Sequence, residues 1–370
     1  MRIIYDHQIF TWQTYGGISR YYYEIANRIA AMGNDVEIFS PFYVNKYFHK
    51  DSQIHPFGFK IPRFSKYIRA IPNIVNEVFS HLLIKRRRDV DIFHETYYSI
   101  NDNCPLSAKR VITIHDMIHE KYARYFPAQD KTRKHKAHAV GNADHIICVS
   151  ENTRRDLMDL LNVPEEKISV VYHGYTLSCS RNDIKTVNNK KPFVLYVGKR
   201  DGYKNFELIL RAFSNSQLLQ KEISIVCFGG GKTLAQEKEL LRLLRLPSDC
   251  VTYIDGNDHV LAGLYASAKA FIYPSLYEGF GIPLLEAMAL GCPVLCSNTS
   301  SIPEVVGNAA LLFDPKDAGN LQIALEKVVF SSDCSETLKV KGYERIKLFS
   351  WEKCAEETLR VYKHVLERST

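Results

Sequence analysis

The residues best suited to chemistry lie in the stretch SLYEGFGIPLLEAMALG, residues 275–291, which places two glutamates eight positions apart. Glu278 stands in a glycine-rich stretch after a strand-like run, whereas Glu286 stands in a run of Leu, Ala and Met that is typical of a helix. Pro283 suits the first position of that helix, and Gly291 suits its end. Amides at a helix start attract anionic or hydroxyl oxygens, so we predict that the two carboxylates contact separate parts of one elongated ligand. On spacing alone, an equal alternative is that Glu278 is a solvated loop charge and Glu286 is a residue on the helix surface.

A second stretch, YVGKRDGYKNF at residues 196–206, gathers Lys199, Arg200 and Lys204 around a glycine-containing turn directly after a predicted strand. Guanidinium and ammonium groups beside exposed loop amides are suited to a diphosphate. A basic loop that is merely solvated is the alternative, and for such a loop alone it is the more common case.

A third stretch, QTYGGISRYYYEI at residues 13–25, places Gly16 and Gly17 where a loop opens into a helix. Such a loop can hold a phosphate or a sugar ring against the helix start. The stretch lacks the full G-x-G-x-x-G spacing, which disfavours an NAD-dependent dehydrogenase. A tight turn without a ligand is the alternative.

The stretch VITIHDMIHEKY, residues 111–122, places His115 and Asp116 at the carboxyl end of a predicted strand, where catalytic groups gather in parallel sheets. His119 and Glu120 follow. Two histidines of this kind bind a metal together only when they share a helix face, and His115 ends a strand, so we predict no metal site. A structural histidine at the strand end is the alternative role for His115.

The elements that must position these residues are predicted to be strands alternating with helices. Continuously apolar runs, typical of strands buried on both faces of a parallel sheet, recur in both halves of the chain. They cover residues 2–6, 35–40, 91–95, 110–116, 145–150 and 168–174, and then 192–198, 223–230, 251–256, 270–275, 293–298 and 309–315. This alternation predicts doubly wound sheets, and hence an α/β fold with two Rossmann-like lobes and a cleft between them.

A polar, asparagine-rich stretch at residues 176–191 is predicted to link the lobes. It separates an N-terminal lobe at 1–175 from a C-terminal lobe at 192–350. The final stretch, 351–370, is predicted to be an amphipathic helix that packs on another part of the chain, with Ser350 as its N-cap. The predicted apolar face of this helix contains Trp351, Ala355, Leu359, Tyr362 and Leu366.

Composition limits the function classes. The 370 residues are 46% hydrophobic and 24% charged, as in soluble globular proteins, and the length predicts two domains. We expect neither a membrane-spanning segment nor a signal peptide. The nine cysteines sit mostly in or beside strand-like runs, which suits reduced thiols in the cytoplasm. The net charge of +7 is too small and scattered to predict a nucleic-acid partner, but it fits phosphorylated small molecules or an anionic lipid surface.

These stretches resemble the retaining nucleotide-sugar glycosyltransferases of the GT-B fold, in the family called glycosyltransferase group 1 or family four. The most specific element is E-G-F-G-x-P-x-x-E followed by A-M-A-x-G-x-P-V, found here at Glu278–Val294. The segment Tyr196–Phe206 is next, and weaker support comes from GGISRY, ITIHD, CVSENTRRDL and ISVVYHG. The resemblance covers nearly the whole chain.

The resemblance implies a donor site in the C-terminal lobe. By this resemblance, Arg200 and Lys204 would hold the donor diphosphate, with Lys199 as their neighbour. Glu286 would accept hydrogen bonds from the ribose hydroxyls, and Glu278 would hold the donor sugar.

The resemblance also assigns roles to backbone groups in both lobes. The backbone of Phe280, Gly281 and Ile282 holds the donor sugar, while Gly16 and Gly17 face the phosphates from the other lobe.

For the N-terminal lobe, the resemblance implies that His115 contacts the sugar near the reacting carbon and that the final helix crosses back onto this lobe. One departure matters. Relatives often carry Asn-Gly-Val-Asp where this chain has His-Gly-Tyr-Thr at residues 173–176, which puts any role of that Asn or Asp in doubt here.

The implied chemistry is transfer of a hexose from a nucleoside-diphosphate sugar. Fixed cations stabilise the charge that builds on the leaving phosphates, so no metal or other cofactor is expected. The sugar becomes oxocarbenium-like, and no carboxylate is clearly placed as a nucleophile, which favours same-face transfer. By the same resemblance, the YKNF variant favours a GDP-mannose type of donor, with a saccharide or lipid-linked acceptor of a surface polysaccharide or glycolipid. A binding protein for nucleotide sugars or sugar phosphates is the alternative; it would need Arg200 and Lys204 but not His115.

A possible membrane contact is indicated by residues 57–88, where apolar and aromatic residues alternate with basic ones. This pattern predicts a cytoplasmic protein that lies peripherally at the inner face of the membrane. A core helix with a solvated basic end is an equal alternative.

Overall fold

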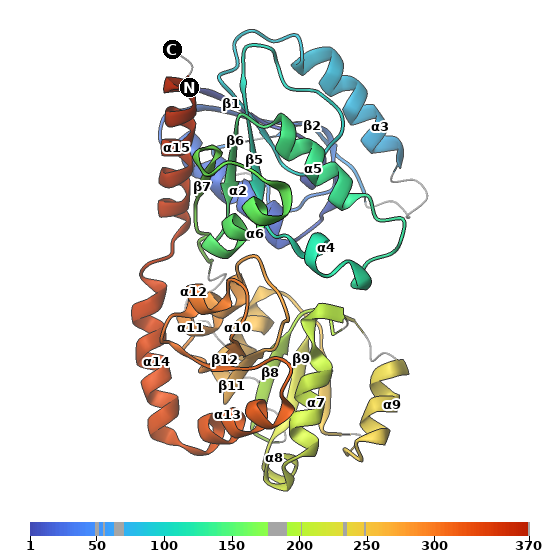
Figure 1. The fold of residues 1–370 in the computed structure, drawn as a ribbon, viewed down its shortest axis with the longest axis vertical. Helices are drawn as coiled ribbons and strands as arrows, with labels where there is room; N and C mark the ends of the chain where they lie inside the picture. Colours follow the sequence, from blue (N-terminus) through green and yellow to red (C-terminus); the bar gives the residue numbers. More distant parts are fainter. Residues whose placement is uncertain are drawn as a thin grey trace. The chain divides into compact units, whose positions relative to one another are not determined.

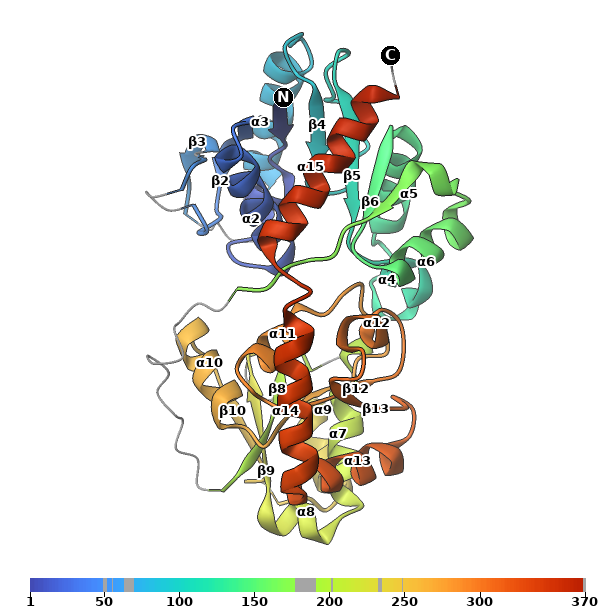
Figure 2. The same cartoon turned by 90° about the vertical axis from the view of Figure 1, so that its left-hand side faces the viewer.

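The computed structural model describes residues 1–48, 52–54, 56–62, 70–176, 191–200, 202–231, 235–247 and 249–368. Most of the predicted linker, part of the 57–88 stretch and Asp201 lie outside the described residues. The chain divides into two compact units, unit 1 at Met1–Gly174 with Ser350–Thr370 and unit 2 at Tyr175–Phe349. Figures 1 and 2 show the two units with their strands and helices.

Unit 1 contains a seven-stranded sheet whose strand pairs are all parallel, in the order β3-β2-β1-β4-β5-β6-β7. The strands are β1 (Arg2–Tyr5), β2 (Asp35–Tyr43), β3 (Pro56–Lys60), β4 (Ile92–Glu95), β5 (Lys109–Ile114), β6 (His145–Cys148) and β7 (Ile168–Val170). Helices α2 (Gly17–Ala31) and α15 (Trp351–Glu367) cover one face, and α3 (Ala70–Phe79) and α5 (Thr132–Asn142) cover the other (Figure 1). The remaining helices are α1 (Gln8–Trp12), η1 (Ser80–Ile84), α4 (Ile118–Lys121), η2 (Ala123–Tyr125), α6 (Glu151–Leu161) and η3 (Glu165–Lys167).

Unit 2 contains a six-stranded parallel sheet in the order β10-β9-β8-β11-β12-β13. The strands are β8 (Phe193–Val197), β9 (Ser224–Phe228), β10 (Val251–Ile254), β11 (Ala270–Tyr273), β12 (Val294–Ser297) and β13 (Ala310–Phe313). Helices α10 (Asp258–Ser267) and α11 (Ile282–Ala289) lie on one face, and α7 (Phe206–Ser214) and α9 (Ala235–Leu243) lie on the other (Figure 2). The remaining helices are η5 (Gly202–Lys204), α8 (Gln217–Glu222), α12 (Ile302–Val306), α13 (Ala318–Phe330) and α14 (Ser332–Ile346).

The two parallel sheets confirm the predicted α/β fold class. In each sheet the first strand lies in the interior, so β1 pairs with both β2 and β4, and β8 pairs with both β9 and β11. The chain therefore leaves neighbouring strands in opposite directions beyond the carboxyl ends of β1 and β4 and of β8 and β11. Ligands of open parallel sheets bind at such switch points.

The final helix packs on unit 1, as predicted. The hydroxyl of Tyr362 lies 2.9 Å from that of Tyr5 on β1, and Ser350 caps the helix by accepting a hydrogen bond from the amide of Lys353 at 3.0 Å. The buried face is rotated slightly from the prediction, because Leu359 and Leu366 are only partly buried. Val361 and Val365 take the buried positions beside them.

Two further expectations concern the burial of the cysteine thiols and the absence of a membrane-spanning helix. Cys148, Cys227 and Cys296 are free, buried thiols, and burial raises the pKa of each above its ordinary value. Within the described residues, no helix combines the length and the apolar character needed to cross a bilayer.

Candidate functional site

Glu278 lies in the loop after β11, and the loop after β12 holds its backbone. The amide of Glu278 donates to Ser300 Oγ at 3.0 Å. The hydroxyl of Ser301 donates to the carbonyl oxygens of Glu278 at 2.8 Å and Phe280 at 3.2 Å. These contacts fix the direction in which the Glu278 side chain leaves the loop.

Helix α11 starts immediately after this loop. Its N-cap is Gly281, whose φ of +114° is in the region that favours glycine, and a Cβ at this position would lie 2.8 Å from Leu284 Cδ1. Glu286 lies one turn inside the helix and is partly buried. Burial, with the nearby Glu286 carboxylate as a further cause, raises the pKa of Tyr265 well above its ordinary value. The predicted division between a loop glutamate and a helix glutamate is therefore present.

The loop after β8 joins the loop after β11 through its backbone. The amide of Leu276 donates to the carbonyl of Tyr203 at 2.8 Å. The side-chain amide of Asn205 donates to the carbonyls of Pro274 at 3.0 Å and Pro315 at 2.8 Å. Asn205 has a positive φ of 58° and is the N-cap of α7, so one asparagine turns the chain and ties three loops together.

These backbone contacts bring Lys204 to Glu278. Lys204 Nζ lies 2.6 Å from Glu278 Oε1, and both side chains are partly exposed. The ammonium also lies 5.2 Å from the ring centroid of Tyr203 and 5.6 Å from that of Tyr273. Burial, and then the Glu278 carboxylate, raises the pKa of Tyr273 well above its ordinary value. The switch point of unit 2 thus holds an ion pair that water can reach.

Arg200 differs from Lys204 because its side chain is 0% exposed. Its Nε donates to Glu237 Oε1 at 2.7 Å, and its terminal nitrogens donate to the carbonyls of Gly229 at 2.8 Å and Gly231 at 2.9 Å. The guanidinium also lies 4.7 Å from the ring centroid of Tyr253. In this structure Arg200 holds the glycine loop after β9 against the loop after β8.

Lys199, the third basic residue of this loop, is exposed. Its carbonyl oxygen accepts a hydrogen bond from the hydroxyl of Tyr196 at the end of β8. The side chain is therefore at the surface while the backbone is fixed.

In unit 1, Gly16 and Gly17 lie at the start of α2, as predicted. Gly16 is the N-cap, and a Cβ there would lie 2.2 Å from Gln13 Oε1. The same oxygen accepts a hydrogen bond from the amide of Ser19 at 3.2 Å. A Cβ on Gly17 would meet no atom within 4 Å, so open space lies beside this helix start.

His115 follows β5 and packs among other rings. Its ring centroid lies 5.3 Å from that of Tyr21, 5.9 Å from that of Tyr22 and 5.7 Å from that of His173. Burial lowers the pKa of His115 to about 3, with His94 and Lys136 as smaller causes. Nε2 of His115 is buried without a hydrogen-bond partner among the described residues. A neutral imidazole nitrogen that lacks a partner can form a hydrogen bond with a ligand hydroxyl.

The neighbouring residues His119 and Glu120 have separate partners. His119 Nδ1 contacts Asp130 Oδ2, and Glu120 Oε2 lies 2.8 Å from Nζ of the fully buried Lys136. No three His, Cys, Asp or Glu side chains within the described ranges are arranged to hold a metal ion.

The structure thus brings Glu278, Lys204 and the start of α11 together within unit 2, and it places Gly16, Gly17 and His115 within unit 1. Sequence reasoning missed Glu237 and the two serines after β12. Two serines at the carboxyl end of a predicted strand were a usable signal for a loop support, but Glu237 lies 37 residues from Arg200 with no motif between them.

Comparisons with known proteins identify the two domains of the chain. The chain matches the family model of the glycosyl transferases group 1 over residues 181–345 and that of glycosyltransferase family 4 over residues 15–178. O-antigen chain mannosyltransferase B of Escherichia coli is 28% identical to this chain, covering 94% of this chain and 96% of its own length.

Solved structures show the same fold. Sucrose-phosphate synthase from Thermosynechococcus elongatus aligns with a TM-score of 0.74 at 21% identity, covering 100% of both chains. WaaG, a glycosyltransferase involved in lipopolysaccharide biosynthesis, aligns with a TM-score of 0.72 at 17% identity, covering 97% of this chain and 99% of its own. Together with the two family models, these alignments confirm the predicted GT-B type of fold.

Proposed function

The chain carries the two domains of the group 1 and family 4 glycosyltransferases, and from this premise we propose that it transfers a hexose from a nucleoside-diphosphate sugar to a saccharide or lipid-linked saccharide. We propose a donor of the GDP-mannose type, because the E. coli relative that spans the chain is named an O-antigen chain mannosyltransferase. The product then belongs to a surface polysaccharide or glycolipid.

The observation that carries this proposal is the Lys204–Glu278 pair at the switch point of unit 2, beside the start of α11. A diphosphate needs a cation and amide donors, and a sugar needs a hydroxyl acceptor. Lys204 supplies the cation, the backbone amides of Gly281 and Ile282 can donate at the helix start, and the Glu278 carboxylate can accept further hydrogen bonds from the sugar. The backbone of Phe280, Gly281 and Ile282 then lies against the same sugar.

Glu286 is proposed to accept hydrogen bonds from the ribose hydroxyls of the donor. It leaves α11 one turn after the helix start, so a nucleotide whose phosphates meet the first turn can extend its ribose toward Glu286. This assignment makes Glu286 a binding residue for the nucleotide and Glu278 a contact for the sugar.

Arg200 is proposed to support the diphosphate together with Lys204, and Lys199 is proposed as their neighbour. Because the side chain of Arg200 is fully buried, direct contact with a phosphate requires the Gly229 and Gly231 carbonyls to move away from it. Before that movement, Arg200 acts by holding the loop that carries Lys204.

Unit 1 is proposed to contribute Gly16, Gly17 and His115 to the same reaction. The open space beside Gly17 admits a phosphate oxygen, and Nε2 of His115 can accept a hydrogen bond from a hydroxyl of the sugar.

We propose that the transfer retains the anomeric configuration and needs no metal. The cations around the proposed diphosphate site offset the charge that develops on the leaving group. Product made from an α-linked donor should be α-linked by proton NMR, and activity should persist in excess chelator. A β-linked product, or activity that returns only with magnesium or manganese, contradicts these two details.

The function is tested by incubating the full chain with GDP-mannose and mannoside acceptors, with UDP- and dTDP-sugars in parallel. Transfer from one donor, together with a rise in the melting temperature in its presence, supports the proposal. Binding of a nucleotide sugar without transfer to any acceptor identifies a non-catalytic binding protein instead.

We also propose peripheral contact with an anionic membrane through the described part of residues 57–88. Ile74, Phe79 and Leu83 are exposed on α3 and η1, and the exposed basic residues Arg86 and Arg88 follow them. An apolar helix face beside cations suits an anionic lipid surface. Liposome co-sedimentation should increase with the fraction of anionic lipid and decrease with salt; indifference to both contradicts this contact.

A further inference from the structure

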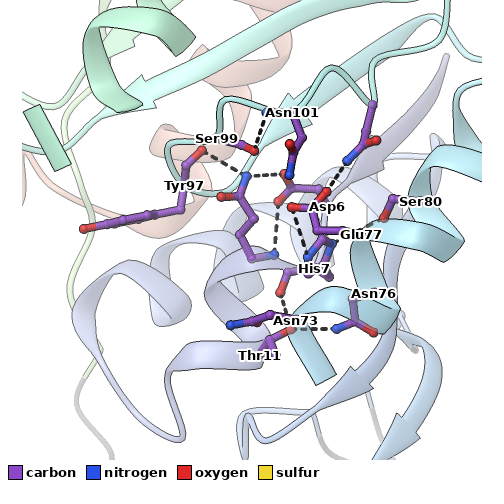
Figure 3. Close-up of polar contacts among 12 residues, drawn as sticks. Asp6, His7, Thr11, Asn73, Asn76, Glu77, Ser80, Tyr97, Ser99 and Asn101 are labelled. Atoms are coloured by element: carbon purple, nitrogen blue, oxygen red, sulfur yellow. Dashed lines mark hydrogen bonds and ion pairs between the residues drawn. The ribbon is translucent and has the colours of Figure 1, made fainter. Parts of the chain in front are cut away.

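The switch point of unit 1 holds a buried polar cluster that the proposed chemistry does not use. Asp6, directly after β1, accepts hydrogen bonds from the amide of Thr96 at 2.9 Å and from Gln8 Nε2 at 2.7 Å. Gln8 Nε2 also donates to the carbonyl of Tyr97 at 3.2 Å. Asp6 thus fixes the loop after β1 to the loop after β4 (Figure 3).

The cluster continues from this switch point to α3. His7 Nδ1 lies 3.4 Å from the hydroxyl of Ser80, and its Nε2 lies 3.8 Å from Glu77 Oε1. The other oxygen of Glu77 accepts a hydrogen bond from Asn103 Nδ2 at 2.6 Å. Figure 3 shows Asp6, His7, Glu77 and Asn101 close together, with Glu77 coming from the helix and Asn101 from the loop after β4. The buried side of Glu77 is therefore held in place.

The other side of Glu77 lines a groove of about 500 Å³ between η1 with the end of α3 and the loop after β4. This volume is within the range of small-molecule sites. Its three apolar lining side chains, Val78, Leu82 and Ile100, are exposed, and its polar lining includes Glu77, Asn101 and Asn103.

The charges of the groove favour a neutral ligand. Lys85, His81 and Asp102 also line it. Asp102 pairs with Lys85 at 3.0 Å and also contacts the guanidinium of Arg110, so both cations have a carboxylate partner. Glu77 adds a carboxylate, which repels a phosphate or another anion. Amide and carboxylate oxygens that accept, an amide nitrogen that donates and apolar side chains beside them match a sugar ring, which presents hydroxyls at its edge and C–H groups on its faces.

Outside the groove, aromatic and amide side chains contact one another at the end of α1. One turn before Glu77, Asn73 Oδ1 accepts a hydrogen bond from Trp12 Nε1 at 2.9 Å. The ring of Trp12 lies 5.1 Å from that of Tyr97 between centroids, and Trp12 is 42% exposed. An exposed indole with an edge-on tyrosine offers an apolar face with a polar rim.

We propose that the groove is a second saccharide site. It binds the acceptor chain away from the sugar residue to which the hexose is added. This inference rests on the proposed function, because a polysaccharide acceptor is long enough to reach beyond the reacting residue. The groove binds internal residues of the chain, and the exposed face of Trp12 at the end of α1 offers a further apolar contact for it.

The test uses isothermal titration calorimetry of the full chain with α-mannohexaose and with methyl α-mannoside. The variants are Ile100→Ser and Asn101→Ala, both at exposed groove positions, and the control is Leu106→Ser, which lies on the same loop outside the groove and is 96% exposed. The wild type should bind the hexaose more tightly than the monosaccharide. Each groove variant should weaken hexaose binding about fivefold to tenfold, whereas Leu106→Ser should not.

Three results overturn this inference: hexaose binding no tighter than monosaccharide binding in the wild type, unchanged hexaose binding in both groove variants, or an equal loss in Leu106→Ser. If the groove variants instead lose binding to phosphatidylglycerol vesicles and keep hexaose binding, the groove is part of a lipid surface and the saccharide assignment is wrong. Unchanged melting temperatures of the variants exclude misfolding as the cause of any loss.

A parallel assay of transfer from GDP-mannose to methyl α-mannoside separates this inference from the proposed function. This short acceptor does not reach the groove, so both groove variants should transfer to it at the wild-type rate. If transfer occurs but the groove variants bind the hexaose as the wild type does, the saccharide assignment of the groove is rejected and the proposed function is kept. Hexaose binding that depends on the groove, without transfer from any nucleotide sugar, rejects the proposed function and keeps the groove.

Discussion

The two switch points of this molecule share one topology and differ in how they hold charge. Beyond β8 and β11, Lys204 and Glu278 form an ion pair in which both side chains remain partly exposed. Beyond β1 and β4, the carboxylate of Asp6 is buried and receives its hydrogen bonds from the uncharged groups of Gln8 and Thr96. Burial raises the pKa of Asp6, and those hydrogen bonds oppose the shift.

This difference shows that the topology of the parallel sheet fixes where a switch point lies, and that the side chains there decide whether it can bind a ligand. An ion pair that water reaches can exchange one partner for a ligand at a modest energetic cost. A buried carboxylate whose oxygens are taken by loop amides serves the fold, since replacing its donors leaves it unsatisfied. We therefore assign donor binding to the Lys204–Glu278 pair and a structural role to the carboxylate of Asp6.

The largest effect is expected for Arg200→Ala, which tests whether buried charge in unit 2 serves the fold as it does in unit 1. Removal of the guanidinium leaves Glu237 buried without its cation, so unit 2 should lose about 3–5 kcal/mol of unfolding free energy. Urea unfolding followed by far-UV circular dichroism measures this loss. Arg211→Ala is the control, because Arg211 pairs with Glu207 at the surface and should cost less than about 0.5 kcal/mol. Equal costs for the two variants contradict a structural role of Arg200.

The next effect concerns acid, because unit 1 buries neutral histidines and unit 2 does not. Burial lowers the pKa of His94 and His115 to about 3, so their folded forms bind a proton more weakly than the unfolded chain does. Their contribution to the free energy of unfolding is complete above about pH 6.5 and is lost as the pH falls toward 3. At pH 5 the loss of unfolding free energy is about 2 kcal/mol per histidine. His259 is the one histidine in the sequence of unit 2.

Tryptophan fluorescence reads this acid transition in unit 1 alone, because Trp12 and Trp351 are the two tryptophans of the chain and both belong to unit 1. On acidification the fluorescence change should precede the loss of the remaining circular dichroism signal. Simultaneous transitions, or a first transition without a fluorescence change, show that unit 1 is not the acid-sensitive unit.

A smaller effect is expected for Lys204→Met, which removes the charge from the switch point of unit 2 and keeps much of the side-chain volume. Loss of a charge-assisted contact to the diphosphate should lower kcat/KM about 10-fold to 100-fold. The melting temperature should change little, because the pair with Glu278 is partly exposed. Steady-state kinetics across donor concentrations measures the change. Wild-type kinetics in this variant would remove Lys204 from the donor site.

The smallest effect is expected for Ser300→Ala, which removes the acceptor for the Glu278 amide. The loss of one neutral hydrogen bond, worth about 1 kcal/mol, should lower kcat about fivefold through a less fixed Glu278. Ser214→Ala, which removes an exposed hydroxyl-to-carbonyl hydrogen bond on α7, is the control. A fall in donor affinity without a fall in kcat indicates that Ser300 supports the nucleotide rather than the reacting sugar.

Much of the fold was predictable because continuously apolar strands alternate with helices in both halves of the sequence. Strand β3, Pro56–Lys60, was missed, because its short aromatic run reads equally as the start of the basic and apolar stretch that follows. The face of the final helix was predicted to within about one residue of rotation, and Leu359 illustrates the error.

The candidate site was predictable wherever one motif carried both the residue and its element, as for Glu278 and Glu286. Pairings across the sheet were not predictable, because they depend on the strand order. Lys204 and Glu278 are 74 positions apart and meet only since β8 and β11 are neighbours. The burial of Arg200 also required the fold, since a basic loop and a buried guanidinium have the same local sequence.

The central claim is that Glu278 and Glu286 hold different parts of one nucleotide sugar. It is tested most directly by calorimetric titration of Glu278→Ala and Glu286→Ala with GDP, alongside turnover with GDP-mannose. Glu286→Ala should bind GDP about 10-fold to 100-fold more weakly. Glu278→Ala should bind GDP nearly as the wild type does but lose most of kcat, because its contact matters most when the sugar changes shape. Equal losses of GDP affinity in both variants, or no loss in either, contradict this division between the two glutamates.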